Sequence, residues 1–265
     1  MNNLSRDEDP KGEATRANNV LRQKFKTYIR QKGFAGTAVF FRGSKTGLDP
    51  TYACMAHDGQ PRRYGMIVID GGEGGTGAGP IEFLDHMGTP LTEGLLFAHN
   101  VLVGTGLRDK IKLGCSAKIV TAFGIASKMA IGADWCNAAR GFMFAVGCIQ
   151  AQRCHTNTCP VGVATQDPHR QKGLVVPDKA ERVYNFHRNT LDALSQVVAA
   201  TGLEHPNQFE PLHVARRVSP TTVLTYEDIY DFLEPGELLE GTPNPLYGKY
   251  WNRADMTQFC RPGHA

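Results

Sequence analysis

The sequence contains no apolar run that approaches the ~18 residues of a membrane-spanning helix. It also lacks a secretory signal, because residues 1–16 (MNNLSRDEDPKGEATR) are polar and have no apolar core. A strong net charge is missing too: the 265 residues carry only +3, and the basic run at 22–32 is more typical of a solvated face than of a nucleic-acid site. We therefore expect a cytoplasmic protein with no membrane or nucleic-acid partner.

Cysteine occurs seven times, an odd number, and without a secretion signal such clustering indicates metal binding or catalysis more than disulfides. Three cysteines stand close together in CIQAQRCHTNTCP, with five residues between Cys148 and Cys154 and four between Cys154 and Cys159. This spacing leaves three alternatives. They are an iron–sulfur cluster held by three thiolates, a zinc site completed by His155, and buried thiols without a metal. Zinc fits least well, because its sites usually show paired C-x₂₋₄-C spacing and four ligands.

Residues 64–139 alternate short apolar runs, loops and helix-type segments. Strands are predicted within 64–70, 111–121 and 133–139, and helices over 92–104 and from an N-cap at Thr121 to Gly132. This order is typical of βα units with a parallel sheet, whose ligand sites lie at the carboxyl ends of the strands. We therefore expect one shared edge to carry Gly72–Gly77, Ser116–Lys118 and Gly132–Asp134.

The glycine-rich turn DGGEGGTGAGP (70–80) allows backbone N–H groups to approach a ligand, and Glu73 is the charged side chain among its glycines. An ordinary surface loop is the alternative. Lys118 and Arg140 follow the next two predicted strands and could add charge for a phosphate group. A surface or ion-paired cation is equally compatible with either position.

The C-terminal part predicts a long helix over 177–206, with Asp178 as N-cap and Glu181 as its capping-box partner. Gly202 and Pro206 are expected to end it. Its core-facing stripe is Val183, Phe186, Leu191, Leu194 and Val198. A shorter helix is expected over 225–235 and an irregular tail from 241. Near the N-terminus, GTAVFF (36–41) is a possible strand in an otherwise poorly ordered segment.

Three stretches together carry a family resemblance: DGGEGGTGAGP, GADWCNAARGFMFAVGCIQAQRCHTNTCPVGVATQ and PDKAERVYNFHRNTL. They resemble the FMN-binding synthase domain of glutamate synthase over about residues 64–235. The resemblance implies a (β/α)₈ barrel that holds FMN beside a 3Fe-4S cluster. In that family, ammonia and 2-oxoglutarate form 2-iminoglutarate, which reduced FMN converts to L-glutamate.

The resemblance assigns roles residue by residue. The cluster ligands are Cys148, Cys154 and Cys159. The acidic position is Glu73, for which we predict a catalytic role, and 2-oxoglutarate binds at Gly72, Gly74, Gly75 and Thr76. The predicted FMN-binding residues are Gly114, Ser116, Ala117, Lys118, Ile119, Gly132, Ala133, Asp134 and Arg140. The family usually has glycine at the position of Ala117 and aspartate at that of Gly124.

The predicted fold class is α/β, with the last three βα units of a TIM barrel (61–175), a C-terminal helical extension (176–240) and an irregular tail (241–265). Residues 1–60 do not resemble the earlier strands of the barrel, so an open sheet edge is expected at Met66–Asp70, and with it aggregation or dependence on a partner. GTAVFF is the candidate for a substitute strand at this edge. Ferredoxin or a subunit that takes electrons from NAD(P)H is a possible electron donor. The alternative function is a non-catalytic remnant or a partner-dependent half-barrel.

Overall fold

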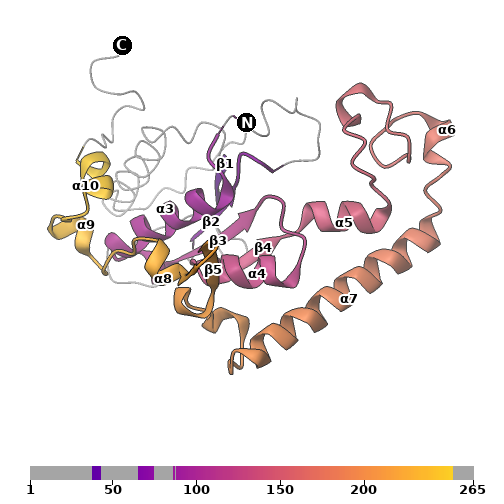
Figure 1. Cartoon of the computed structure of the whole chain (residues 1–265). Coiled ribbons are helices and arrows are strands. Elements are labelled where there is room, and N and C mark those ends of the chain that lie inside the picture. The colour runs from indigo at the N-terminus through magenta and orange to yellow at the C-terminus, as the bar shows by residue number, and fades with distance from the viewer. Residues whose placement is uncertain (1–37, 43–64, 75–85, 87, 253–265) are drawn as a thin grey trace, which may run out of the picture.

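The computed structural model describes residues 38–42, 65–74, 86 and 88–252 (Figure 1). Its main sheet has four strands in the order β1-β2-β3-β4, which are β1 (Ala38–Arg42), β2 (Gly65–Asp70), β3 (Ile111–Ser116) and β4 (Trp135–Asn137). The strands β2, β3 and β4 run parallel. The predicted α/β class and the parallel arrangement of three strands are confirmed.

The expected open edge at Met66–Asp70 is wrong, because β1 pairs with β2 along those residues. The pairing is antiparallel and runs from Ala38↔Asp70 to Arg42↔Met66. A β-ladder is formed by backbone groups, so the polar segments that flank 38–42 in the sequence do not prevent it. Residues 38–42 therefore supply a strand that pairs with the β2 edge and becomes the outer strand of the sheet.

One helix follows each parallel strand. These are α3 (Leu91–Gly104), α4 (Ala122–Met129) and α5 (Ala139–Val146). The helix α3 begins one residue before the predicted start and ends at Gly104, as expected. The predicted N-cap of α4 is confirmed, because Thr121 Oγ1 accepts a hydrogen bond from Gly124 N–H at 3.0 Å.

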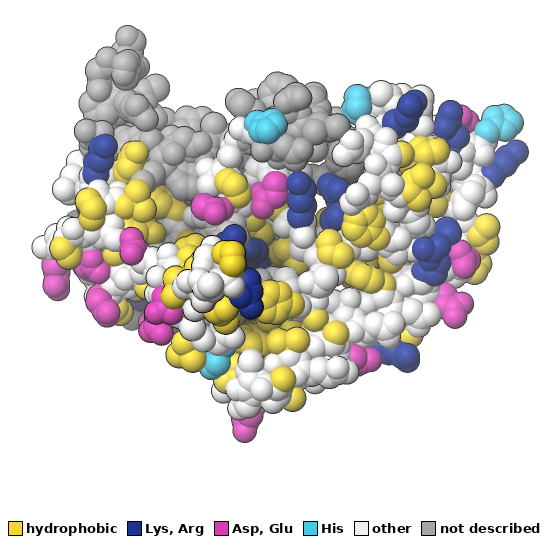
Figure 2. All heavy atoms as spheres, viewed as in Figure 1, with side chains coloured by type: hydrophobic (Ala, Val, Ile, Leu, Met, Phe, Trp, Pro, Cys, Tyr) yellow, Lys and Arg dark blue, Asp and Glu magenta, His cyan; other side chains and the backbone are white. Residues whose placement is uncertain are grey.

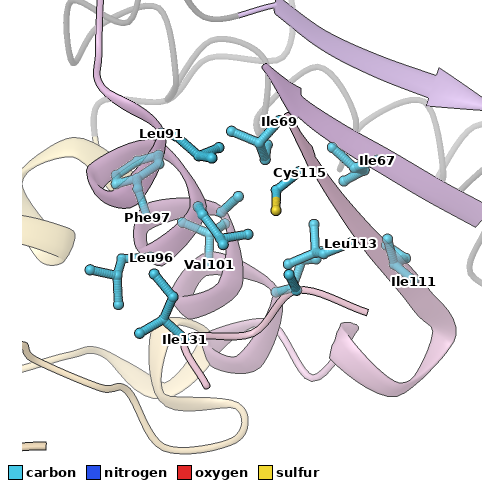
Figure 3. Close-up of a cluster of buried hydrophobic side chains, with 14 of the residues drawn as sticks. Ile67, Ile69, Leu91, Leu96, Phe97, Val101, Ile111, Leu113, Cys115 and Ile131 are labelled. Atoms are coloured by element: carbon cyan, nitrogen blue, oxygen red, sulfur yellow. The ribbon is translucent and has the colours of Figure 1, made fainter. Parts of the chain in front are cut away.

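The main core lies between α3 and the face of β2 and β3 that it covers (Figure 3). Side chains alternate along a strand, so Ile67 and Ile69 of β2 and Leu113 and Cys115 of β3 point to the same face. All four are at most 1% exposed. They pack against the apolar side of α3, which contributes Leu91, Leu95, Leu96, Phe97, Ala98, Val101 and Leu102.

The C-terminal part adds α6 (Pro168–Gln171) and the long α7 (Val176–Ala200), which runs beside α5 and α4 (Figure 1). The predicted N-cap at Asp178 is wrong: α7 begins at Val176, and Pro177 occupies its first turn, where proline's fixed φ is favourable. Gly202, at φ +74°, ends the helix region as predicted. In the predicted stripe, Leu194 and Val198 are buried but Leu191 is 48% exposed.

After α7 comes a hairpin of β5 (Ala215–Ser219) and β6 (Thr222–Thr225), then α8 (Tyr226–Ile229), α9 (Glu237–Glu240) and α10 (Pro245–Trp251). The helix predicted over 225–235 stops at Ile229. Asn100 on α3 explains this, because its Oδ1 accepts from Leu233 N–H at 3.0 Å and its Nδ2 donates to Asp231 C=O at 2.8 Å. The tail is not irregular throughout, since α10 buries Tyr247.

Four short 3₁₀ segments complete the described chain, at Arg108–Lys110, Cys154–Thr156, Pro206–Gln208 and Pro211–His213. Among the described helices, none is both long enough and apolar enough to cross a bilayer.

Candidate functional site

The carboxyl ends of β2 and β3 meet at one edge of the sheet. Gly71 N–H donates to Ser116 C=O at 2.8 Å, which joins the glycine-rich loop after β2 to the turn after β3. Gly72 N–H donates to Thr89 C=O at 2.8 Å, and Gly74 N–H donates to Gly71 C=O at 2.9 Å. The structure thus brings the loop at 71–74 and the turn at 116–118 together, as predicted. Gly75 and Thr76 lie outside the described residues.

Glu73 lies against the N-terminus of α3. Both carboxylate oxygens are 3.0 Å from Leu91 N–H, which has no partner within the helix. A carboxylate at this end also interacts favourably with the helix dipole. The arrangement requires glycine at position 71, because a Cβ there would lie 2.4 Å from Glu73 Oε2 and 2.7 Å from Leu91 N. Glu73 therefore fixes the loop on α3, and its predicted catalytic role stays a prediction.

The turn after β3 has an unusual backbone. Ala117 has φ +157° and Lys118 has φ +46°, values that glycine adopts more easily than other residues. Ala117 is buried, and a Cβ on Gly74 would lie only 3.1 Å from the Ala117 Cβ. Lys118 is exposed. The turn therefore packs tightly beneath the glycine-rich loop and presents a basic side chain outside it.

Asp70 is a further acidic residue at this edge that the sequence analysis did not select. It is the last residue of β2. Partial burial raises the pKa of its carboxyl group, and a hydrogen bond with the Ser116 side chain opposes that rise. The sequence feature that could have identified Asp70 is its position directly before the glycines.

The third loop does not share this edge. Gly132–Asp134 precedes β4 and so lies at the amino ends of the strands. Asp134 N–H donates to Leu113 C=O at 2.6 Å, and Asp134 Oδ2 pairs with Arg108, which precedes β3, at 2.9 Å. The prediction that the three loops lie together is therefore wrong for Gly132–Asp134. These residues form the turn between α4 and β4 rather than the loop after a strand.

At the carboxyl end of β4 the chain runs almost directly into α5. Asn137 ends the strand, and Arg140 lies in the first turn of α5. N–H groups at a helix N-terminus and a nearby arginine are suited to a phosphate group. Arg140 is thus placed on the edge that the sequence predicted for it.

Three other predicted FMN-binding residues have packing roles. A Cβ on Gly114 would lie 2.2 Å from the Trp135 ring, so the indole occupies the space that a side chain would need. Ile119 is 3% exposed and Ala133 is 5% exposed. Ile119 and Ala133 thus belong to the core, and only their backbone groups are available to a ligand.

The three clustered cysteines lie in the loop between α5 and α7. Among the residues that the structure describes, no three His, Cys, Asp or Glu side chains lie close enough to hold a metal ion. The prediction that the sulfurs of Cys148, Cys154 and Cys159 face one another is therefore wrong for this structure. Asn157 organises the loop instead: its Oδ1 accepts from Gln166 N–H at 2.6 Å and its C=O accepts from Thr165 Oγ1 at 2.7 Å.

Cys159 nevertheless has an environment suited to a thiolate ligand. Burial alone would raise the pKa of its thiol. Hydrogen bonds from the backbone N–H groups of Ala164, Val161, Val163 and Gly162 outweigh that effect and lower the pKa. Hydrogen bonds to sulfur also tune protein-bound iron–sulfur clusters. The donor chemistry at Cys159 therefore fits a cluster, although the three sulfurs are not assembled.

A cavity of about 970 Å³ lies at the opposite, amino-terminal side of β3 and β4. Arg108 Nε donates to His99 Nδ1 at 3.2 Å, and burial together with the Arg108 charge lowers the pKa of His99 to about 4, against an opposing effect of Asp134. Acidic side chains gather over α8 and α9 in Figure 2, and Glu227 and Glu237 of these helices line the cavity. No sequence motif indicated it, because it forms only where residues 207–244 pack below the sheet.

Comparison with known proteins adds a family assignment. A family described as a conserved region in glutamate synthase matches residues 51–204, more than half of the chain. The glutamate synthase large subunit-like protein YerD of Bacillus subtilis is 43% identical over 62% of the chain, which spans 31% of that protein.

Two further relatives agree. The glutamate synthase [NADPH] large chain of Bacillus subtilis is 31% identical over 72% of this chain, which spans 13% of it. Ferredoxin-dependent glutamate synthase 2 of Synechocystis is 38% identical over 46% of this chain, which spans 8% of it. The chain thus spans less than a third of each relative, and over residues 51–204 it belongs to the glutamate synthase family.

Proposed function

We propose that the chain performs glutamate synthase-type oxidoreduction, the reduction of 2-iminoglutarate, formed from 2-oxoglutarate and ammonia, to L-glutamate. The observation that supports this most directly is the bond from Gly71 N–H to Ser116 C=O, which unites two of the predicted ligand loops at the carboxyl edge of parallel strands. Ligands bind at this edge in α/β folds. We further propose that β2, β3 and β4 correspond to the last strands of a (β/α)₈ barrel.

The basic side chains and backbone groups at this edge fit FMN. In our proposal its phosphate binds at Ser116–Lys118 and at the N-terminus of α5, where Arg140 lies. Gly132, Ala133 and Asp134 have no part in this proposal, because they lie at the other edge. Gly72, Gly74, Gly75 and Thr76 are the proposed 2-oxoglutarate-binding residues. Because the N–H groups of Gly72 and Gly74 already donate to Thr89 C=O and Gly71 C=O, their part in the proposal is to keep the loop free of side chains where the substrate binds.

The acidic group of the proposed site is Glu73. Its carboxylate is held by Leu91 N–H, so it is oriented before any substrate arrives. Asp70 lies nearby at the end of β2, and partial burial raises the pKa of its carboxyl group.

Cys148, Cys154 and Cys159 are the proposed ligands of a 3Fe-4S cluster. Backbone hydrogen bonds lower the pKa of the Cys159 thiol, and Cys148 and Cys154 must move toward Cys159 to share a cluster with it. When bound, FMN supplies hydride transfer and the cluster supplies single electrons. Relatives named for ferredoxin and for NADPH support either as the source of electrons. A cytoplasmic location remains a prediction.

The test is anaerobic purification with added FMN, iron and sulfide, followed by measurement of flavin and iron per chain. We expect stoichiometric flavin and about three iron atoms per chain, one for each thiolate ligand. We also expect glutamate formation from 2-oxoglutarate and ammonium with a reduced electron donor. Cys159→Ser should remove the iron, while the control His155→Ala should retain it, because His155 is a ligand only in the zinc alternative.

A chain that binds neither flavin nor iron after this treatment would contradict the proposal. That outcome would favour the alternative of a non-catalytic remnant or a half-barrel that depends on a partner chain.

A further inference from the structure

Two cysteines outside the clustered loop lie side by side in the sheet. Cys115 and Cys136 are register partners on the neighbouring parallel strands β3 and β4. Their sulfur atoms are 3.4 Å apart, a distance at which one thiol hydrogen-bonds to the other. The proposed function uses neither of them.

The two thiols differ in exposure. Cys115 is fully buried, and Figure 3 shows its side chain within the apolar cluster near Ile69 and Leu113. Cys136 is only half-buried and lies between the two hydrophobic clusters of the protein. A small reagent therefore reaches Cys136 first.

Their surroundings make the thiols chemically unequal. A hydrogen bond from Cys115 lowers the pKa of Cys136, burial opposes this, and the charge of Lys128 lowers it further. The same hydrogen bond, together with burial, raises the pKa of Cys115. Lys128 is itself held in place by a hydrogen bond from its Nζ to Thr92 Oγ1. Cys136 is thus the thiol of the pair that ionises more readily.

The strand geometry permits a bond between them. Neighbouring strands lie about 4.8 Å apart, and disulfides join residues whose Cα atoms are about 4.4–6.8 Å apart. The sulfurs must approach from 3.4 Å to about 2.05 Å, which side-chain rotation can supply without moving either strand.

We propose that Cys115 and Cys136 form a reversible redox site that a small peroxide oxidises to a disulfide. The Cys136 thiolate attacks one peroxide oxygen, the O–O bond breaks, and the protonated leaving group departs as water from hydrogen peroxide. Cys136 is then a sulfenic acid, which is two electrons more oxidised. The Cys115 sulfur attacks the Cys136 sulfur, and the hydroxyl group takes up the Cys115 proton and leaves as a second water. A dithiol reductant returns both thiols.

The bond would join the strands just before their carboxyl-edge segments. Ser116 directly follows Cys115, and Asn137 directly follows Cys136. Oxidation therefore fixes the spacing between the turn at 116–118 and the start of α5. The chemistry depends only on the two thiols and is independent of whether flavin binds.

Peptide mapping of the full-length chain tests the proposal without substitutions. Reduced protein is exposed to increasing hydrogen peroxide, free thiols are alkylated, and the chain is digested with trypsin. Cleavage after Lys112, Lys118, Lys128 and Arg140 places Cys115 in the peptide 113–118 and Cys136 in the peptide 129–140. We expect these two peptides linked, with the loss of two hydrogen atoms, and separated again by dithiothreitol.

Two variants test the roles of the thiols. Cys115→Ser should leave Cys136 as a sulfenic acid that dimedone labels, because the second thiol is missing. Cys136→Ser should leave Cys115 unlabelled, since that sulfur is buried and its pKa is raised. Separate alkylation of both peptides, at peroxide levels that oxidise Cys148, Cys154 or Cys159, would overturn the proposal. Linkage of Cys136 to one of those three cysteines would overturn it equally.

Discussion

Ala117 has a backbone conformation that costs energy for any residue with a Cβ. Its φ is +157°, and strained φ/ψ positions cost about 1–3 kcal/mol. Glycine removes the strain but adds about 0.5–1 kcal/mol of chain entropy in the unfolded state. We therefore expect Ala117→Gly to raise the free energy of unfolding by about 1 kcal/mol, measured by urea denaturation.

Ala193 provides a control for this substitution, because it is an exposed residue within the helix α7. Ala193→Gly relieves no backbone strain and loses helix propensity, so it should lower the free energy of unfolding by about 1 kcal/mol. An equal loss of stability in Ala117→Gly would show that the backbone at 117 is not strained.

His99 should make stability depend on pH. Protonation of its Nδ1 would remove the acceptor for Arg108 Nε and bring two positive groups together. The unfolded histidine takes up a proton below pH 6.5, whereas the folded one does so only near pH 4. Stability is therefore fully present above about pH 6.5 and falls as the pH drops toward 4. Between pH 7 and 5 we expect a loss of about 2 kcal/mol.

The variant His99→Gln isolates this effect, because glutamine does not titrate and its side-chain oxygen can still accept from Arg108. Urea denaturation of both proteins between pH 7 and pH 4 gives the free energy of unfolding of each as a function of pH, and the two curves are then compared. Parallel curves would contradict the lowered pKa of His99.

At the residue scale, the sequence was enough to predict a hydrogen bond when its two partners lie near each other in the chain. The cap of Thr121 on Gly124 N–H is three residues away and was predicted. The contact of Glu73 with Leu91 N–H spans 18 residues, and that of Asn100 with Leu233 N–H spans 133. Only the tertiary structure brings such partners together, so neither role followed from the sequence.

The first turn of α4 lacks an acidic residue, and Gly124 stands three residues after its N-cap. Glutamate at that position completes a capping box with Thr121 and favours the helix dipole. We expect Gly124→Ala to stabilise the protein by about 0.5–1 kcal/mol through helix propensity. Gly124→Glu should add about 0.5 kcal/mol more through its charge.

Thermal unfolding of the two variants measures these contributions. In both, the new Cβ would lie 3.3 Å from Thr121 Oγ1, so any crowding cancels in the comparison. Equal melting temperatures for the alanine and glutamate variants would rule out the capping box.

At the element scale, the βα units could be predicted because their buried strands are short apolar runs that end in loops. The hairpin of β5 and β6 could not, since most of its residues are exposed and give no apolar alternation. The boundary of β4 was also inaccessible, because a three-residue strand is fixed by pairing with β3 and not by its composition. As a result, the sequence analysis expected Gly132–Asp134 at the carboxyl ends of the strands, although these residues precede β4.

For the whole molecule, β1 decides whether β2 presents a free edge to other chains. Consecutive residues of an antiparallel strand direct their N–H groups alternately toward and away from the partner strand. Proline is tolerated on an edge strand only where the N–H faces away. We therefore expect either Val39→Pro or Phe40→Pro, but not both, to increase aggregation, measured by light scattering.

The two proline variants are controls for each other, because both fix φ and only one removes a ladder bond to β2. If both variants scatter light equally, or if neither differs from the unaltered chain, β1 does not protect β2. The aggregation expected from a free edge at Met66–Asp70 then returns as a prediction; with β1 in place that edge is paired, and β1 is the outer strand.

The loop that contains the clustered cysteines begins and ends at two helices that are already packed together. Phe142 of α5 and Phe186 of α7 have ring centroids 5.3 Å apart, and a Cβ on Gly141 would lie 2.7 Å from the Phe186 ring. Figure 1 shows this loop, with α6, projecting from the far end of α7. The packed helices α5 and α7 therefore hold the two ends of the loop close together, whatever conformation the loop itself adopts. A rearrangement inside the loop, which ligation of one cluster by Cys148, Cys154 and Cys159 would need, therefore incurs no further cost of bringing the loop ends together.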